Sequence, residues 1–418
     1  MPRFRIYTSL RGYFQTFREL LFGTYDKGDE VEHLEKTLAD QFGTKHAICV
    51  SQARIGIYLA VKHLIPKGKE LIMSPYTIAD VVNMVICAGA HPVFCDLESD
   101  TCNIAPQKIE NLITPNTGGV LITHLHGLAA APELILKICK QHNIPLIEDS
   151  AQAFGTLVNE KRTGTFGRAG IYSLGMFKNV NAWYGGIVAT HDDALARALR
   201  NEVHSFALES PQVLKKRAIK GMTTDIATYP PLFKSSVFWI FRFGCLFDIE
   251  AINKRVRTEL DTSRYDQIKE SYLRRLTPLQ ARLAIPQLDE IDTKSDSRIA
   301  KAKRYYEGLR NLPELTLPPP RFDRSHIYTY YPIRARERNS ILKWLMKHRC
   351  DVGAQHLKNC ASLPGFTEFG GECPIAEATA RELILLPTYP TYSDADVDRN
   401  ISVIKSYFST THRTTTKH

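Results

Sequence analysis

Apolar residues follow two different spacings between about residue 29 and residue 204, and the two spacings alternate along the chain. EVEHLEKTLADQFG (30–43) carries apolar residues at helical spacing, whereas HAICVS (46–51) and IPLIEDS (144–150) are short apolar runs that end in polar residues. Strands that alternate with helices form right-handed crossovers and a mostly parallel sheet with helices on both faces. We therefore expect an α/β domain over residues 29–204.

The ends of the apolar runs are the places where a ligand site is expected. In sheets of this kind, ligands bind beyond the carboxyl ends of the strands. The residues at or just after these ends are Ser51, Thr77, His124, Asp149 and Ser173. These five residues are therefore the first candidates for a functional site.

The alternation stops near residue 204, and segments of a different character follow. PPLFKSSVFWIFRFGCLF (230–247) is densely apolar and aromatic and lies behind the basic run LKKRAIK (214–220). From residue 277 the pattern predicts a long helix that is interrupted at Pro286. We expect five parts: an N-terminal basic and aromatic segment (1–28), the large domain (29–204), an insert (205–270), a long helix with a small α+β domain (271–410) and a polar tail (411–418).

The composition is typical of a soluble globular protein. The 418 residues are 44% hydrophobic and carry a formal net charge of +10, which we interpret as a basic surface or as pockets for phosphorylated small molecules. No nucleic-acid-binding motif accompanies the charge, so we expect no nucleic-acid partner. The nine cysteines have neither CxxC nor zinc-ligand spacing, and we find no signal peptide and no membrane-spanning run. The sequence predicts a cytoplasmic protein with reduced thiols and no metal site.

Lys178 stands among small and aromatic residues, 29 positions after Asp149 (178 − 149) and just before a Gly-Gly pair. A lysine that forms an imine most often holds pyridoxal phosphate, which also needs a carboxylate at its pyridine nitrogen and a cup of amides and hydroxyls for its phosphate. Asp149 can supply the carboxylate, Ser173 a hydroxyl, and a helix that begins near Ser51 the amides. Each residue alone is more often a surface charge, a cap or a turn residue, but their order on an α/β pattern favours a cofactor site.

The segment IEDSAQAFGTLVNEKRTGTFGRAGIYSLGMFKNVNAWYGGIVAT (147–190) resembles the core signature of the DegT-type (DegT/DnrJ/StrS) sugar aminotransferases, which are fold-type-I pyridoxal-phosphate enzymes. The resemblance implies a mostly parallel seven-stranded sheet sandwiched by helices, a smaller C-terminal α+β domain and a homodimer. The similarity extends to GDEVEHLEKTLADQFGTKHAICVS (28–51), SPYTIADVVNMVICAGAHPVFCDLESDTCNIAP (74–106), THLHG (123–127), RLTPLQARLAIPQL (275–288) and, more weakly, AEATARELILLPTYPTYSDADVD (376–398).

Carried onto the matching positions, the resemblance assigns a role to each residue of the site. It makes Lys178 the Schiff-base lysine and proton shuttle, and Asp149 the partner of the pyridinium nitrogen. Gln152 packs against the cofactor ring and its 3-hydroxyl. Ser173 binds the phosphate, and His124 lines the site beside the sheet.

Three positions depart from the family pattern. Where the family has a small residue and a threonine after the first strand, this chain has Ala53 and Arg54, and Arg54 is either a bidentate phosphate contact or a side chain directed to solvent. Ile78 stands where the family stacks an aromatic ring on the cofactor. Leu273 replaces an asparagine that reaches the neighbouring subunit's cofactor phosphate. The phosphate side of the site therefore differs from that of the relatives.

The resemblance implies an aminotransferase that moves an amino group from glutamate or glutamine to a nucleotide-linked keto-sugar. The product would be used in the assembly of surface polysaccharides or natural products. One alternative is a lipid-linked or membrane-delivered substrate, and another is a dehydratase-like reaction, against which Lys178 speaks because dehydratase relatives carry histidine there. A third alternative, from another class, is a non-catalytic sensor. We interpret residues 229–250 as a buried or dimer-interface helix, as a peripheral contact with the inner face of the membrane, or as a partner site.

Overall fold

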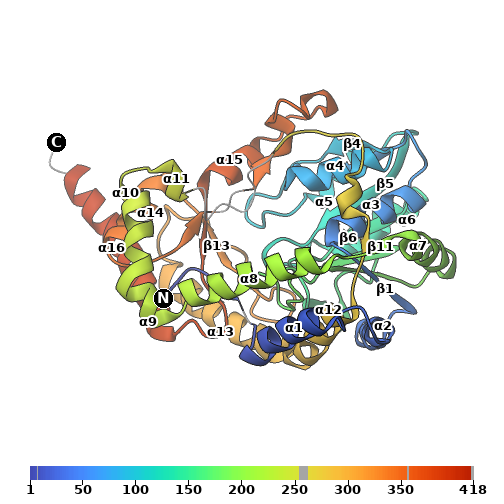
Figure 1. Ribbon diagram of the computed structural model, residues 1–418. Coiled ribbons are helices and arrows are strands. Elements are labelled where there is room, and N and C mark those ends of the chain that lie inside the picture. Colours follow the sequence, from blue (N-terminus) through green and yellow to red (C-terminus); the bar gives the residue numbers. More distant parts are fainter. Residues whose placement is uncertain (7, 254–261, 355–356, 416–418) are drawn as a thin grey trace.

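A seven-stranded sheet forms the centre of the large domain (Figure 1). The computed structural model describes residues 1–6, 8–253, 262–354 and 357–415. Strand β10 runs antiparallel to both of its neighbours, and the remaining neighbours are parallel. This arrangement confirms the predicted mostly parallel sheet. In spatial order the strands are β1 (His46–Val50), β10 (Gly186–Thr190), β9 (Ala169–Ser173), β6 (Leu146–Asp149), β5 (Thr117–Thr123), β2 (Glu70–Met73) and β4 (His91–Phe94).

Helices cover both faces of the sheet, because side chains alternate between the faces along each strand. Ile171 and Val188 pack on one face, whereas the adjacent Tyr172 and Ile187 pack on the other. The first face is covered by α3 (Ala53–Leu64), α4 (Ala79–Cys87) and α7 (Asp193–Ser205), and the second by α2 (Glu30–Phe42), α6 (Pro132–Gln141) and α12 (Pro278–Ala284).

Short elements connect these strands and helices. Three two-stranded pairs occur: β3 (Tyr76–Thr77) with β15 (Lys358–Asn359), β7 (Leu157–Val158) with β8 (Lys161–Arg162), and β11 (Ala207–Leu208) with β12 (Arg274–Arg275). The short helical turns are α5 (Pro106–Ile109), η1 (Glu110–Leu112), η2 (Leu125–Gly127), η5 (Glu270–Tyr272), η7 (Cys360–Ser362) and η8 (Thr367–Phe369).

The C-terminal part has its own core around a three-stranded antiparallel sheet. The predicted interruption at Pro286 is a 3₁₀ segment, η6 (Ile285–Glu290), which separates α12 from α13 (Ile291–Leu309) because proline has no amide hydrogen to donate. The other elements here are β13 (Tyr331–Arg334), α14 (Arg338–Lys347), β14 (Gly353–Ala354), α15 (Pro374–Glu382), β16 (Leu383–Leu386) and α16 (Asp394–Thr415), whose last turn extends into the expected tail.

The residues of the expected N-terminal segment and insert form helices that lie on the outside of the molecule. In Figure 1, α8 (Pro211–Ala227) crosses the front beside α1 (Leu10–Phe22), and α10 (Phe238–Leu246) lies beside α14. The described residues of the insert also form α9 (Pro230–Leu232), the π-helical turn η3 (Phe233–Val237) and α11 (Glu250–Asn253). Within the described ranges, no helix is both long enough and apolar enough to cross a membrane.

Candidate functional site

The strand ends bring three of the predicted site residues to one edge of the sheet. Asp149 ends β6, where it is paired with Thr123 of β5 on one side and with Ile171 of β9 on the other. His124 directly follows β5, and Ser173 is the last residue of β9. Because β5, β6 and β9 are neighbours with parallel directions, their carboxyl ends share one edge.

Lys178 belongs to the loop that joins β9 to β10 and therefore reaches the same edge. Its amide donates to the carbonyl of Gly175 (2.9 Å), and the Gly175 amide donates to Ser173 Oγ (3.3 Å). Burial lowers the pKa of the Lys178 amine below its ordinary value, and the charge of Asp149 opposes this shift. The loop thus holds a primary amine in a partly buried position, where desolvation favours the neutral, nucleophilic form.

Asp149 is the electrostatic counterpart of Lys178. Burial raises the pKa of its carboxyl group, while the Ala151 amide, which donates to Oδ1 (3.0 Å), and the charge of Lys178 oppose the rise. A buried carboxylate of this kind is stabilised by a cation or by an N–H donor placed against it.

The N-terminus of α3 forms a third wall. No side chain caps it at Gln52, and the first intrahelical bonds come from the amides of Ile55 and Gly56 to the Gln52 carbonyl (3.0 and 3.2 Å). The amides of Ala53 and Arg54 precede that turn and point out of the helix end, where an anion is favoured. A Cβ at Gly186 would lie 2.5 Å from the Ala53 nitrogen, so the second glycine of the Gly-Gly pair allows β10 to contact this helix end.

The side chain of Arg54 is held by groups of its own chain. It forms an ion pair with Asp80, and it donates to the Tyr272 hydroxyl (3.3 Å) while its guanidinium lies over the Tyr272 ring. The Tyr265 hydroxyl also donates to Asp80 (2.8 Å). Arg54 is therefore not directed freely to solvent, and its predicted contact with a phosphate would have to compete with Asp80.

Ile78 and Leu273, the other two departures from the family pattern, lie close in sequence to Asp80 and Tyr272, which hold Arg54. Ile78 is the N-cap residue of α4 and is partly exposed beside Thr77. Leu273 ends the turn η5, and the Tyr272 carbonyl just before it accepts from Ser51 Oγ (2.7 Å). The end of the insert thus packs against the segment that begins α3.

Gln152 fixes a turn that carries a histidine missed by the sequence analysis. Its Oε1 accepts from the amide of His126 (3.1 Å), a residue with a left-handed backbone (φ 56°). The His126 ring is 1% exposed, and neither ring nitrogen has a hydrogen-bond partner among the described residues. Burial and the charge of Lys178 lower the pKa of His126 to about 4. The His326 ring is also buried, and its nitrogens have no hydrogen-bond partner among the described residues. The amide of the next residue, Ile327, donates to the Gly127 carbonyl (3.0 Å).

His124 is fully buried and engaged on both ring nitrogens. Nδ1 accepts from the Ala130 amide (3.0 Å), so the proton lies on Nε2, which donates to Glu148 Oε2 (3.1 Å). Glu148 also accepts from the amides of Gly164 (2.8 Å), Phe166 (2.7 Å) and Gly167 (2.7 Å). This carboxylate therefore fixes His124 and a loop on the sheet face opposite to Asp149.

The N-terminal residues reach the loop of Lys178. The Phe4 ring packs edge-on against Phe177 (5.1 Å between centroids), and Asn181 donates to Thr8 Oγ1 (2.7 Å). Arg3 pairs with Asp351 of the C-terminal part (2.8 Å). These residues tie the lysine loop to the smaller core.

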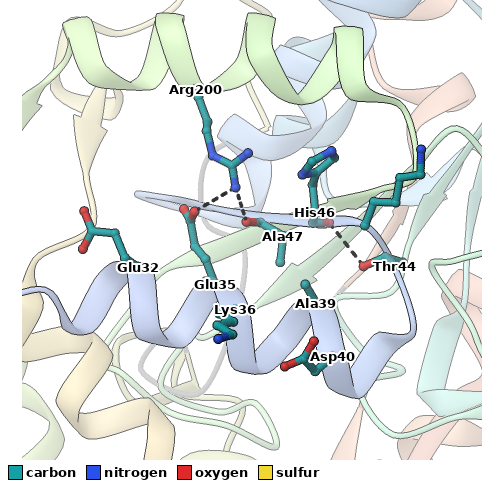
Figure 2. Close-up of a pocket in the computed structure, with 10 residues that line it drawn as sticks. Glu32, Glu35, Lys36, Ala39, Asp40, Thr44, His46, Ala47 and Arg200 are labelled. Atoms are coloured by element: carbon teal, nitrogen blue, oxygen red, sulfur yellow. Dashed lines mark hydrogen bonds and ion pairs between the residues drawn. The ribbon is translucent and has the colours of Figure 1, made fainter.

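A separate surface hollow of about 370 Å³ lies between α2, β1 and α7, at the β1 edge of the sheet. Figure 2 shows Arg200 of α7 reaching Glu35 of α2 (3.2 Å) and the Ala47 carbonyl (3.5 Å) across it. Burial raises the pKa of Glu35, and the Cys49 amide and Arg200 oppose the rise. The ion pair between Arg200 and Glu35 crosses this hollow and joins α7 to α2. None of the predicted site residues lines the hollow.

The residues at the sheet edge fit pyridoxal phosphate. The fit rests on the chemistry of the donors: a partly buried amine with a lowered pKa for the aldehyde, a buried carboxylate for the pyridinium N–H, and a helix N-terminus without a side-chain cap for the phosphate. The same three groups answer the three needs of this cofactor.

Comparison with known sequences agrees with this chemistry. The sequence pattern of the DegT/DnrJ/EryC1/StrS aminotransferase family matches residues 13–226 and 249–405. The chain belongs to this family. The protein is a pyridoxal-phosphate-type sugar aminotransferase with the fold of its relatives.

Three similar proteins illustrate the range of the family. The chain is 27% identical over 394 residues to the spore coat polysaccharide biosynthesis protein SpsC of Bacillus subtilis, a match that covers 92% of this chain and 90% of that protein. An aminotransferase from Psychrobacter cryohalolentis has a similar structure (TM-score 0.77, 20% identity, 98% and 100% covered). The GDP-4-keto-6-deoxy-D-mannose-3-dehydratase of E. coli, with bound hydrated PLP, is also similar (TM-score 0.73, 16% identity, 96% and 98% covered).

Proposed function

We propose that this aminotransferase transfers the amino group of glutamate or glutamine to a nucleotide-linked keto-sugar, as a cytoplasmic homodimer, in the assembly of surface polysaccharides or natural products. The observation that carries the proposal is the partly buried Lys178 amine, whose lowered pKa and carboxylate neighbour Asp149 suit transamination. The similarity to the polysaccharide biosynthesis protein of B. subtilis supports the choice of a sugar acceptor.

Each residue of the site has a physical task in this proposal. Pyridoxal phosphate, when bound, supplies an aldehyde that captures amines and a pyridinium ring that withdraws electrons. Asp149 holds the proton on the ring nitrogen. The Ala53 and Arg54 amides and Ser173 Oγ would bind the phosphate, and Gln152 and Ile78 would hold the ring in place. Lys178 Nζ would accept a proton from the Cα of the amino-acid donor and hold it for return.

The lysine distinguishes this reaction from the dehydratase-like alternative. The task requires an amine that is neutral when it accepts the proton, and burial of Lys178 shifts its pKa in that direction. His124 has both ring nitrogens engaged, one by the Ala130 amide and the other by the Glu148 carboxylate. We therefore assign the proton transfers to Lys178.

The test separates the two halves of the reaction. Protein loaded with the cofactor and mixed with glutamate should release about one equivalent of 2-oxoglutarate, and subsequent addition of a nucleotide-linked keto-sugar should yield the amino-sugar. Lys178→Ala, which should retain the phosphate contacts, serves as the control and should release none. Wild-type protein that binds the cofactor but forms no keto acid from any amino acid would overturn the proposal.

A second candidate is the same reaction on a lipid-linked or membrane-delivered sugar. It is favoured by the apolar side chains of residues 229–250, several of which are exposed: Tyr229, Leu232, Trp239, Ile240, Phe243 and Phe247. A keto-sugar that is turned over only when it is carried by a lipid in vesicles would select this candidate over the nucleotide-linked acceptor.

A further inference from the structure

Exposed apolar side chains are concentrated on two outer segments of the chain. Of the fifteen large hydrophobic side chains that are exposed in the described part of the molecule, all but Leu134 and Phe177 lie within residues 10–22 and 213–247. A soluble surface normally scatters such side chains singly, and a concentration of them indicates an interaction site. The thirteen are Leu10, Phe14, Leu21, Phe22, Val213, Ile219, Ile226, Tyr229, Leu232, Trp239, Ile240, Phe243 and Phe247.

These side chains belong to helices that lie against one another. The Tyr13 hydroxyl of α1 donates to Asp225 of α8 (2.5 Å), and the Tyr13 ring packs on Trp183 (5.1 Å between centroids). Figure 1 shows α1 lying along α8, and α8 leading through α9 to α10. We call the exposed side of these helices the α1–α8–α10 surface.

Helix α10 is apolar on two opposite sides. Phe238 and Phe241 pack with Met346 of α14, which accounts for one side. Trp239, Ile240 and Phe243 occupy the other side at helical spacing and remain 43%, 56% and 53% exposed. Packing within the chain therefore explains only half of this apolar helix.

Helix α1 repeats the pattern with basic residues beside it. Leu10, Phe14 and Leu21 are spaced by four and seven residues, which places them on one stripe of the helix. All three are exposed, and so are Arg11 and Arg18, which lie along one side of the stripe. An apolar stripe flanked by arginines is typical of a helix that lies in a membrane interface.

The charge of the chain is concentrated on the same segments. Residues 1–22 contain four basic residues and one acidic residue, and residues 211–247 contain six and one, which gives a net charge of +8 out of +10 for the whole chain. Both acidic residues are engaged: Glu19 pairs with Arg282 (2.6 Å), and Asp225 accepts from Tyr13. The exposed basic side chains are Arg11, Arg18, Lys215, Lys216, Lys220 and Lys234.

We propose that the α1–α8–α10 surface docks the protein on an anionic membrane surface, with its aromatic side chains in the interface and its basic side chains against the lipid headgroups. The positive charge of this surface favours an anionic membrane over a second copy of the chain. A second copy of the chain related by a two-fold axis would bring two surfaces of the same positive sign together, and such an interface is repulsive. An anionic leaflet supplies both the opposite charge and an apolar layer. The inference concerns where the protein binds and does not depend on which sugar it aminates.

Vesicle flotation tests the inference with the full chain and without any substrate. Wild-type protein should float with phosphatidylcholine vesicles that contain phosphatidylglycerol, should float much less with phosphatidylcholine alone, and should be released by salt. Lys215→Glu/Lys216→Glu should lower the partition coefficient by at least about 25-fold, which is about fivefold for each lysine lost. The matched control Lys137→Glu/Lys140→Glu, which has the same change of charge on α6, should float like the wild type.

A second pair of variants tests the apolar contribution. Ile240→Ser/Phe243→Ser should lower the partition coefficient at least tenfold, whereas Leu134→Ser, an exposed leucine of α6, should leave it unchanged. Folding of each variant is checked by its thermal unfolding transition, and light scattering reports the oligomeric state. The inference is overturned if the wild type does not float, if the docking variants float as well as their controls, or if Ile240→Ser/Phe243→Ser converts a dimer into a monomer.

Discussion

Buried Asp149 and partly buried Lys178 form a pair in which desolvation shifts the pKa of each group toward its neutral form, while the attraction between the two charges opposes both shifts. The pair is built by two neighbouring strands, because β6 ends at Asp149 and the loop after β9 carries Lys178. The effect of each charge on the pKa of the other group can be tested without the cofactor.

We expect Asp149→Asn to lower the pKa of Lys178 further below its ordinary value. The substitution removes the charge that raises this pKa and leaves the desolvation that lowers it. The pH dependence of acylation of Lys178 in the apoprotein, read by mass spectrometry of its peptide, gives the midpoint. Asp192→Asn, which loses a carboxylate paired with Arg168 at another place, should leave the midpoint unchanged. A midpoint that rises in Asp149→Asn would contradict the described pair.

Glu148→Gln should destabilise the fold by about 3 kcal/mol. The buried Glu148 carboxylate accepts from three backbone amides and from a histidine N–H. Glutamine has one acceptor oxygen, and its NH₂ group would face some of these donors. Chemical denaturation monitored by fluorescence measures the change. Glu133→Gln, on an exposed side chain that accepts from Asn159, is the control and should change the free energy of unfolding by less than about 0.5 kcal/mol. Equal losses in both variants would contradict the special position of Glu148.

Arg54 and Asp80 allow the proposed phosphate contact to be tested by a pair of opposite changes. If Arg54 binds the phosphate of the cofactor, Arg54→Ala should raise the dissociation constant of pyridoxal phosphate roughly tenfold, about the value of one charge-assisted hydrogen bond. Asp80→Asn should lower it, because the guanidinium loses the ion pair that competes for it. Titration of the apoprotein with the cofactor measures both constants. If both variants bind the cofactor like the wild type, Arg54 has only its structural role with Asp80 and Tyr272.

The sequence was sufficient for the parts of the structure that depend on local pattern. The alternation of short apolar runs with segments of helical spacing predicted the mostly parallel sheet, and Pro286 marked the break before α13. The strand-end rule placed His124, Asp149 and Ser173 at one edge, because the rule needs only strand order and direction. The sequence left several interpretations of residues 229–250, because a segment that is apolar all round does not show which side its own chain will cover.

Contacts between distant segments could not be predicted in this way. Tyr272, which lies over Arg54, is 218 positions away (272 − 54), and the pairing of Arg54 with Asp80 depends on how the end of the insert returns to α3. His126 was visible in THLHG as a second histidine. Its burial without a partner results from the backbone of residues 325–329, which pairs with its turn: Thr329 donates to the His126 carbonyl (3.0 Å).

The two unpartnered histidines predict how stability depends on pH. The pKa of His126 is about 4 in the folded protein, and that of His326 lies well below its ordinary value, in both cases chiefly because of burial. In the unfolded chain both titrate near pH 6.5. Between pH 6.5 and about 4 the unfolded chain therefore binds protons that the folded protein does not, and stability falls as the pH falls through this range.

His126→Phe should remove the share of this loss that comes from His126, which is at most about 3 kcal/mol between pH 6.5 and 4. Phenylalanine keeps a ring in the buried space and cannot be protonated. Free energies of unfolding measured by urea denaturation at several pH values should fall less steeply toward low pH in the variant than in the wild type. The control is His33→Phe on the exposed side of α2, which should leave the slope unchanged. A slope that is identical in His126→Phe and the wild type would mean that His126 accepts a proton in the folded protein as readily as in the unfolded chain, contrary to its buried, unpartnered state.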